Sequence, residues 1–423
     1  MSDLVDECGR PGAAPGALPA LARDEFPALL GEPGVVYLDS AATTQKPQRV
    51  IDAVTTELGG PAGNPGRGAY PWSSRAARLV QQVRERVTQF VGAQDPDEIV
   101  FVPGATAGLH AVALSWGMAN LADGDEVLFS PLDHSSTVYP WISLRQALSR
   151  SGTRISLVPY SVTAAGEADT ADILAKVSPR TRLILASHVH SLFGSMTTLE
   201  ELRGRLGAQV RLCFDCTQSA GHVPLDVTRL DADFAVLSGH KMFGIPGTGV
   251  LYARRRVHPE LTPFLPGGGT SVRLQEGLLQ GLRMPGSLEG GTPDLPGIVA
   301  LGAALDFIEE LGIGRIAAHG QALTHFLISQ LREIPKLTLL PGVAWGQCPA
   351  GYGIVSFRLD GVRSDDLGFA LSAHGFYVRA GQHCLPSGSG YADSVRVSMH
   401  VYNSGAELSR LAAVLSGLAE GAG

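Results

Sequence analysis

Lysine is rare in this chain, and the position of one lysine suggests covalent chemistry. Among the 33 lysine and arginine residues, the lysines are Lys46, Lys176, Lys241 and Lys336. Lys46 and Lys336 adjoin prolines in loop-like sequence, and Lys176 lies in a polar helical stretch. Lys241 instead follows ADFAVLS (232–238), an apolar run typical of a buried strand. Most lysines after strands are solvated surface residues, but an amine at this place can form a Schiff base with a carbonyl compound.

Further polar side chains follow predicted strands in the same way. They are Asp215 at the end of VRLCFD (210–215), Ser238 and His240 beside Lys241, Thr106 after EIVFV (98–102), and His134 after EVLFS (126–130). Open parallel sheets bind their ligands at the carboxyl ends of the strands. We therefore expect these side chains and Lys241 to face one crevice.

The residue types in this crevice match the needs of pyridoxal 5′-phosphate (PLP). This cofactor requires an amine for its aldehyde, an anion beside its pyridine nitrogen, a flat ring against its face, and N–H and hydroxyl groups around its phosphate. In that order the candidates are Lys241, Asp215, His134, and the set Ala105, Thr106, Ser238 and His240. Each has an ordinary alternative, since a strand-end Asp or His often caps a helix. The combination at one sheet edge favours a cofactor site.

A second candidate group surrounds Cys384 in RAGQHCLPSGSGY, a glycine- and serine-rich segment after FYVR. Arg379 and His383 are basic neighbours that can lower the pKa of its thiol. Arg379 and Arg396 can bind a substrate carboxylate in a bidentate manner. The alternatives are an inert loop cysteine and an Arg379 that pairs with an acidic residue. A mobile loop suits a nucleophile that collects a group at a buried site and passes it outward.

The remaining cysteines do not form a metal or disulfide pattern. Cys213 and Cys216 have CxxC spacing, but Cys213 lies within a predicted buried strand and no second ligand pair exists, so we predict no metal site. Cys8 and Cys348 lie in loop-like sequence without an evident partner. Few, unevenly spaced cysteines favour a reducing compartment, and we predict a cytoplasmic protein.

Composition and periodicity predict a two-unit α/β protein. From about residue 96, apolar β-branched runs alternate with helical stretches, which is typical of a mostly parallel sheet with helices on both faces. GVLYAR (249–254) is a candidate strand of opposite direction, and residues 255–297 resemble loops. We predict a tail at 1–24 that packs on the small domain, a large cofactor-binding domain at 25–295, and a smaller C-terminal α+β domain at 296–423 that carries the Cys384 loop.

Charge and hydropathy exclude several classes of partner. The net charge of −7 gives no electrostatic basis for binding nucleic acid or an acidic membrane surface. No apolar run reaches the roughly 18 residues that span a bilayer. The first 20 residues lack the features of a signal peptide and suggest a poorly ordered tail.

Several motifs resemble those of the class V aminotransferase family, and in particular the group II cysteine desulfurases. They are YLDSAATTQKP (37–47), GATAGLH, DHSSTVYPW (133–141), DCTQSAGHVPLDV (215–227), DFAVLSGHKMFGIPGTGVLYAR, EGGTPD (289–294) and RAGQHC (379–384). The resemblance covers the chain from about residue 25. It implies PLP fold type I, with a seven-stranded sheet, and a homodimer with shared active sites.

The resemblance also implies roles for individual residues. Lys241 would hold PLP as a Schiff base, Asp215 would pair with the pyridine nitrogen, Gln218 would bind the ring hydroxyl and His134 would stack on the ring. Ala105, Thr106, Ser238 and His240 would bind phosphate, and Thr292 would reach the phosphate of the neighbouring subunit. Arg67, Ser191, Arg379 and Arg396 would contact the substrate. Lys241 would move the α-proton of L-cysteine, Cys384 would take its sulfur as a persulfide with release of alanine, and an acceptor protein would remove the sulfur.

The chain departs from the desulfurase pattern at three places. Ser191 replaces the usual asparagine, with His190 beside it, DHSS lacks a paired histidine, and Arg396 follows Cys384 by only 12 positions. The alternatives are therefore another class V enzyme that does not use Cys384, namely a C–S or selenocysteine lyase, an epimerase or an aminotransferase. A third hypothesis is a non-enzymatic sulfur carrier or scaffold.

Overall fold

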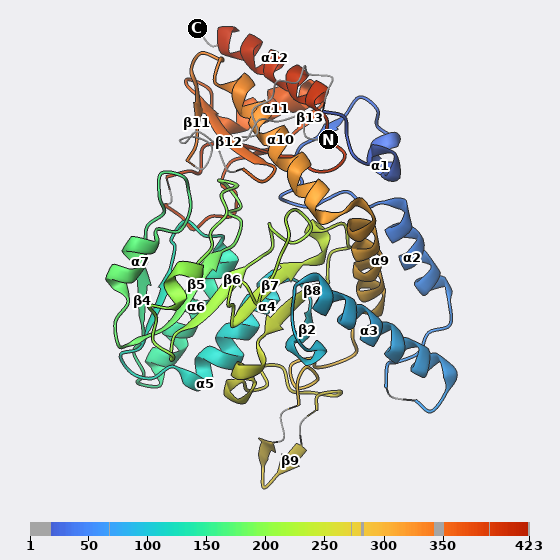
Figure 1. The fold of residues 1–423 in the computed structure, drawn as a ribbon, viewed down its shortest axis with the longest axis vertical. Helices are drawn as coiled ribbons and strands as arrows, with labels where there is room; N and C mark the ends of the chain where they lie inside the picture. Colours follow the sequence, from blue (N-terminus) through green and yellow to red (C-terminus); the bar gives the residue numbers. More distant parts are fainter. Residues whose placement is uncertain are drawn as a thin grey trace.

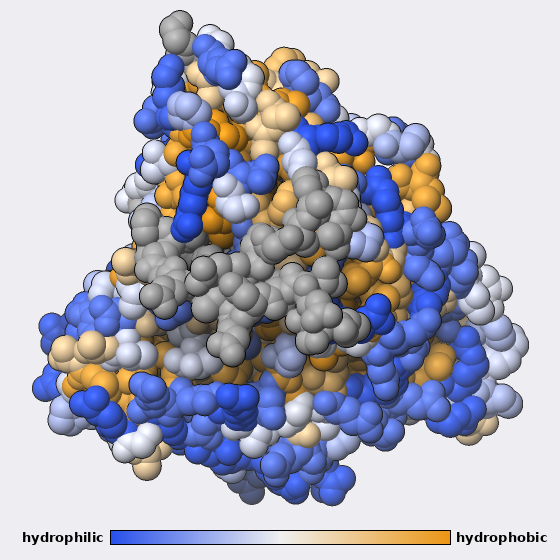
Figure 2. Space-filling view, turned by 45° about the horizontal axis from the view of Figure 1, so that its top comes forward, coloured by the Kyte–Doolittle hydropathy of each residue, from blue (hydrophilic) through white to orange (hydrophobic). Residues whose placement is uncertain are grey.

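The computed structural model describes residues 18–66, 68–271, 273–280, 283–341, 351–388 and 390–421 (Figure 1). The predictions for Arg67, Cys8, Cys348 and residues 1–17 lie outside these ranges. No helix within them is long and apolar enough to cross a membrane. Hydrophilic residues spread over the face drawn in Figure 2, with smaller hydrophobic areas between them.

A seven-stranded sheet forms the centre of the large unit. Its strands are β2 (Ile99–Val102), β3 (Glu126–Phe129), β4 (Ser156–Pro159), β5 (Thr181–Ser187), β6 (Arg211–Asp215), β7 (Phe234–Ser238) and β8 (Gly249–Ala253). They lie in the order β2-β8-β7-β6-β5-β3-β4. β8 runs antiparallel to both of its neighbours, as predicted, and the other pairings are parallel. This mostly parallel sheet confirms the predicted fold class.

Helices cover both faces of the sheet because successive strand residues point to opposite sides. In β5, Ile184 and Ala186 join the core formed with α2 (Gln48–Gly59), α3 (Pro71–Phe90) and α9 (Leu295–Leu311). Leu183 and Leu185 join a second core formed with α4 (Ala105–Ala111), the π-helical turn Val112–Gly117 and α6 (Ser135–Arg150). The shorter helices are α1 (Pro27–Leu30), α5 (Met118–Asn120), α7 (Thr170–Lys176) and α8 (Glu200–Arg203).

A smaller antiparallel sheet organises the C-terminal unit. It contains β11 (Leu337–Leu339), β12 (Ile354–Leu359), β15 (Val395–Ser398) and β14 (Arg379–Ala380), in that order. Its core includes residues of α10 (Ile313–Leu331), α11 (Ser364–Ala373) and α12 (Gly405–Gly421). Near the N-terminus, β1 (Val36–Tyr37) pairs with β13 (Phe376–Tyr377), and Leu18 packs on the same core. The exact domain boundaries remain a prediction.

The segment 255–297 contains more structure than the loops we predicted. A 3₁₀ turn covers Arg255–Glu260, and β9 (Arg273–Gln275) and β10 (Leu278–Gln280) form an antiparallel hairpin that projects at the lower edge in Figure 1. Glu276 and Gly277 connect the strands with φ values of 51° and 79°. Two successive positive φ angles are typical of a two-residue hairpin turn, and Gly277 can adopt one of them without steric cost.

Candidate active site

A cavity of about 680 Å³ lies at the carboxyl ends of the parallel strands. Most of the predicted site residues line it: Ala105, Thr106, His134, Ser191, Asp215, Gln218, Ser238, His240, Lys241, Arg379, Cys384 and Arg396. Thr292 instead lines an adjacent hollow of about 440 Å³, which shares Pro103 and Gly247 with the cavity. The prediction that several strand ends face one crevice is therefore correct.

Lys241 ends the 3₁₀ turn Gly239–Lys241 that directly follows β7. Burial and the nearby Arg396 guanidinium lower the pKa of its amine to about 8, although Asp215 and Cys384 oppose this shift. An amine with a lowered pKa is present in part as the uncharged nucleophile near neutral pH. Its position and its pKa both suit covalent attachment of an aldehyde.

Asp215 ends β6 and is held by two hydrogen bonds. The backbone N–H of Thr217 donates to Oδ1 over 3.0 Å, and the hydroxyl of Thr137 donates to Oδ2 over 3.1 Å. The carboxylate is buried but belongs to the cavity lining. Thr137 was missed in the sequence. It lies three residues after His134, and side chains three apart on a helix share a face.

His134 caps helix α6 and lines the cavity at the same time. Its Nδ1 accepts the backbone N–H of Ser136 over 3.1 Å. Burial lowers the pKa of the imidazole, with smaller contributions from Lys241 and Arg396, although Asp215 opposes this shift. The capping role and the predicted ring-stacking role are therefore compatible, because a neutral flat ring can face an aromatic ligand.

Several buried polar atoms of the cavity lining have no hydrogen-bond partner among the described residues. They are Ser191 Oγ, Thr217 Oγ1, Gln218 Oε1, His383 Nδ1 and Arg396 Nε. Buried polar groups in native proteins are almost always satisfied. Their concentration here indicates a polar ligand that supplies the missing partners, and both donors and acceptors are available. The residues present therefore fit PLP.

Cys384 is exposed at the mouth of this cavity. His383 and Cys384 have φ values of 46° and 57°, a region that L-residues rarely adopt and that costs conformational energy. The Cys384 carbonyl accepts the backbone N–H of Ser135 over 2.9 Å, which ties the loop to the start of α6. Despite the short interval to Arg396, the loop reaches the cavity.

Arg379 and Arg396 lie directly opposite each other on β14 and β15. Arg396 is buried and donates to the Ser191 carbonyl over 3.0 Å and to Asp39 Oδ1 over 3.1 Å. Arg379 is exposed and makes no ion pair with any acidic residue in the described part of the chain. Like charges directly opposite on a sheet repel each other, so this pair favours an anion such as a carboxylate between them.

His383 does not act on Cys384 as we expected. It is buried, and its Nε2 lies 2.9 Å from the Ser394 hydroxyl and 3.0 Å from the Ser394 carbonyl. Burial lowers the pKa of its imidazole to about 4, so the ring is neutral at pH 7. The prediction that His383 helps to lower the thiol pKa as a cation is wrong, because burial removed the charge.

The CxxC pair has no place in the cavity. Cys213 and Cys216 are fully buried in the two cores on either side of the sheet. Burial raises the pKa of both thiols. Cys213 is therefore a small core residue, as predicted.

Comparisons with known proteins give the family. Residues 36–411 match the model of the class-V aminotransferases. The chain is 35% identical over 400 residues to cysteine desulfurases of Escherichia coli (strain K12 / DH10B) and Shigella flexneri, covering 92% of this chain and 95% of each relative.

Solved structures agree with this assignment. The apo cysteine desulfurase of Thermococcus onnurineus NA1 superposes with a TM-score of 0.85 at 30% identity, over 94% of this chain and 97% of that one. The cysteine desulfurase CsdA of Escherichia coli gives 0.83 at 28% identity, with the same coverage. The resemblance inferred from the motifs is confirmed, and this chain belongs to the class-V aminotransferase family.

Proposed function

We propose that this chain is a PLP-dependent cysteine desulfurase that converts L-cysteine to alanine and collects the sulfur on Cys384. One observation carries the proposal: Lys241, Asp215 and Cys384 line the same cavity, although they come from distant parts of the sequence. The desulfurase relatives at 35% identity support the same activity.

When bound, PLP withdraws electrons from the carbon that carries the amino group of the substrate. Lys241 would hold the aldehyde carbon covalently, and the Asp215 carboxylate would keep the pyridine nitrogen protonated. Gln218 donates to the Ala41 carbonyl over 2.8 Å, which leaves its Oε1 free to accept the ring hydroxyl. His134 would pack on the ring face.

The phosphate would lie on the side of the cavity lined by Ala105, Thr106, Ser238 and His240. Thr292 would complete the phosphate site of a second copy in a homodimer. This assignment remains a proposal, since Thr292 lines the adjacent hollow within its own chain.

Arg379 and Arg396 would bind the substrate carboxylate, and Ser191 Oγ would make one of the remaining polar contacts. Lys241 would be released when the substrate amino group takes its place on the aldehyde carbon, and its uncharged amine would then take the α-proton. The Cys384 thiolate would attack the substrate sulfur, so that an S–S bond forms as the C–S bond breaks. The electron pair left on carbon would be protonated to give the methyl group of alanine. A cytoplasmic acceptor protein would then remove the persulfide sulfur.

Mass spectrometry after incubation with L-cysteine tests this proposal. We expect one additional sulfur on Cys384 and release of alanine, both lost in Cys384→Ala. Cys8→Ala is the matched control for removal of a thiol elsewhere. Alanine release that survives Cys384→Ala would refute the persulfide route.

Ser191 favours a second candidate, a C–S or selenocysteine lyase, because a short hydroxyl replaces the amide expected of desulfurases at this place. Such an enzyme would turn over its substrate without Cys384, but not without Lys241. The Cys384→Ala measurement separates the two candidates.

A further inference from the structure

The backbone carbonyl of His240 is crowded with hydrogen-bond donors from a segment almost 200 positions earlier in the chain. The Thr44 N–H lies 3.0 Å from this oxygen, and the Thr44 hydroxyl and Lys46 Nζ each lie 3.1 Å from it. The Thr43 hydroxyl is also 3.1 Å away. A carbonyl oxygen has two lone pairs, so the other three donors already satisfy it and the Thr43 proton is not needed there.

Thr43 has a second acceptor within reach. Its Oγ1 lies 3.2 Å from Nδ1 of the His240 ring and 3.4 Å from Lys46 Nζ. An ammonium group can only donate hydrogen bonds, so Lys46 donates one to the Thr43 oxygen. The Thr43 proton is then free to point at Nδ1, and in that arrangement Nδ1 acts as an acceptor.

This direction determines the tautomer of His240. Burial lowers the pKa of its imidazole to about 4, so the ring carries one proton at neutral pH. If Nδ1 accepts, that proton is on Nε2. Nε2 has no hydrogen-bond partner among the described residues, and His240 lines the cavity. The ring therefore presents an N–H donor to whatever occupies this part of the site.

Lys46 is suited to this task because its charge is not neutralised by an acidic residue. It is half-buried, and no carboxylate in the described ranges lies within ion-pair distance. Its contacts are neutral oxygens of Thr43, Thr44 and His240. Burial lowers the pKa of its amine to about 8, which still leaves it mostly protonated at pH 7.

We propose that Lys46 and Thr43 are positioning residues, which fix the tautomer of His240 and so direct its Nε2–H at the cofactor phosphate. The inference rests on the proposed function, since it concerns the phosphate of PLP. A merely structural role would instead anchor the turn that carries Lys241 and would affect any ligand of this cavity equally.

Binding of PLP and of pyridoxal, which lacks the phosphate, to the full-length apo protein separates these roles. For Thr43→Val and Lys46→Met we expect about tenfold weaker binding of PLP, the loss of one hydrogen bond to a charged group. Binding of pyridoxal should change by less than about twofold. Thr43→Ser and Lys46→Arg should restore PLP binding, and Lys176→Met is the control for loss of a surface lysine.

Equal losses for PLP and pyridoxal, or no loss for either, would overturn the inference. If the unsubstituted apo protein bound no PLP, the proposed function would fail and the inference with it. Nitrogen NMR of the unsubstituted protein gives a test that needs no folded variant at Thr43 or Lys46. His240→Gln identifies the His240 signals by difference. We expect a protonated Nε2, and a protonated Nδ1 would refute the tautomer.

Discussion

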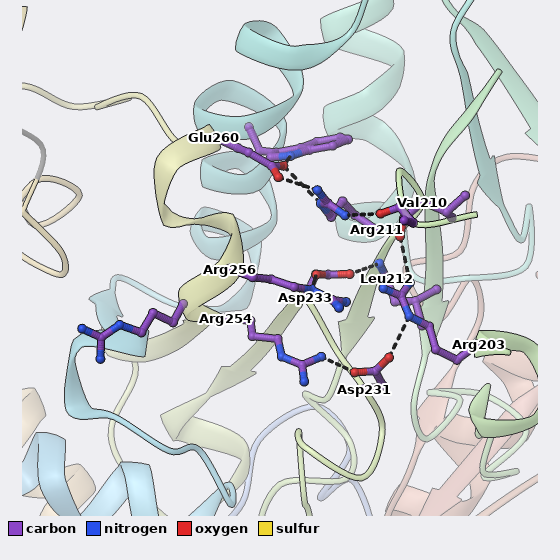
Figure 3. Close-up of polar contacts among 12 residues, drawn as sticks. Arg203, Val210, Arg211, Leu212, Asp231, Asp233, Arg254, Arg256 and Glu260 are labelled. Carbon is purple, nitrogen blue, oxygen red and sulfur yellow. Dashed lines mark hydrogen bonds and ion pairs between the residues drawn. The ribbon is translucent and has the colours of Figure 1, made fainter. Parts of the chain in front are cut away.

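Charged residues at the two ends of the strands of the central sheet differ in how fully they are hydrogen-bonded. At the end where β6 and β7 begin, Asp231 forms ion pairs with Arg203 and Arg254 (Figure 3). Asp233 accepts a hydrogen bond from Arg256 over 2.6 Å and another from the Leu212 N–H over 3.0 Å. Arg211 and Glu260 form a further pair there, and Trp116 donates to Glu260 over 2.7 Å. The carboxylates drawn in Figure 3 are all bonded.

At the opposite end, the carboxyl ends of the parallel strands, buried polar groups are left without partners and can bind a ligand. Ser191, Thr217, Gln218 and Arg396 each contribute an unpartnered buried atom to the cavity, and the buried Asp133 beside it has an unpartnered Oδ2. Unsatisfied buried groups lower stability, and such groups are retained where a ligand needs them. The groups at the start of β6 and β7 therefore stabilise the fold, and those at the carboxyl ends of the strands are suited to binding a ligand.

The largest expected effect of a substitution is at the cavity, at Lys241. Lys241→Ala removes the amine that would hold the cofactor, so activity should fall by at least about 10³-fold. The absorbance near about 420 nm that marks the covalent link should also disappear. Visible spectra and alanine release are the measurements, with Lys176→Ala as the control. An unchanged visible band would show that another residue holds the cofactor.

The next largest expected effect is on stability, at the ion pair of Asp233 with Arg256. Asp233→Ala leaves Arg256 and the Leu212 N–H without their partner, so the free energy of unfolding should fall by about 3 kcal/mol. Urea unfolding of the holoenzyme measures this change. The matched control is Asp366→Ala, which removes the exposed ion pair with Arg363 and should cost less than about 0.5 kcal/mol. A similar cost for both substitutions would contradict the contrast between buried and exposed pairs.

Substitution of Asp133 should stabilise the protein, whereas substitution of Asp233 should destabilise it. Burial, with a contribution from the nearby Asp215, raises the pKa of the Asp133 carboxyl from 3.8 to about 7. Because the folded-state pKa is higher than the unfolded one, the protonated group favours folding, and this contribution is lost as pH rises from about 4 through 7. Asp133→Asn should therefore stabilise the protein by about 2 kcal/mol at pH 8.

This gain should shrink steadily on acidification and should be small at pH 4.5. Unfolding measured across that pH range checks the sign. A gain from Asp133→Asn that does not depend on pH would mean that Asp133 does not titrate in this window.

The smallest effect concerns the support of Asp215. Thr137→Val removes one of the two hydrogen bonds that hold the carboxylate, and cofactor affinity should fall about fivefold, equivalent to about 1 kcal/mol. Titration of the apo protein with PLP measures it, and Thr137→Ser should retain most of the affinity. An equal loss with serine, which keeps the hydroxyl, would show that the hydrogen bond to Asp215 does not account for the affinity.

Much of the site could be predicted from the sequence because its positions follow from local patterns. Apolar runs located the strands, and Asp215, Ser238 and Lys241 follow directly from strand ends. The hairpin at 273–280 was missed because its strands are short and exposed. The sequence does not indicate Lys46, because its neighbours in the chain resemble a loop and its contact with His240 spans 194 positions.

The order of residues shows which chemical groups this protein has and which strands they follow, since helix and strand periodicity is a local property. The states of these groups depend on the folded chain. Folding neutralised His383 by burial, paired Arg396 with Asp39, and brought Thr137 to Asp215 and Lys46 to His240. Protonation and hydrogen bonding depend on burial and on neighbours from distant segments, and these exist only after the chain has folded.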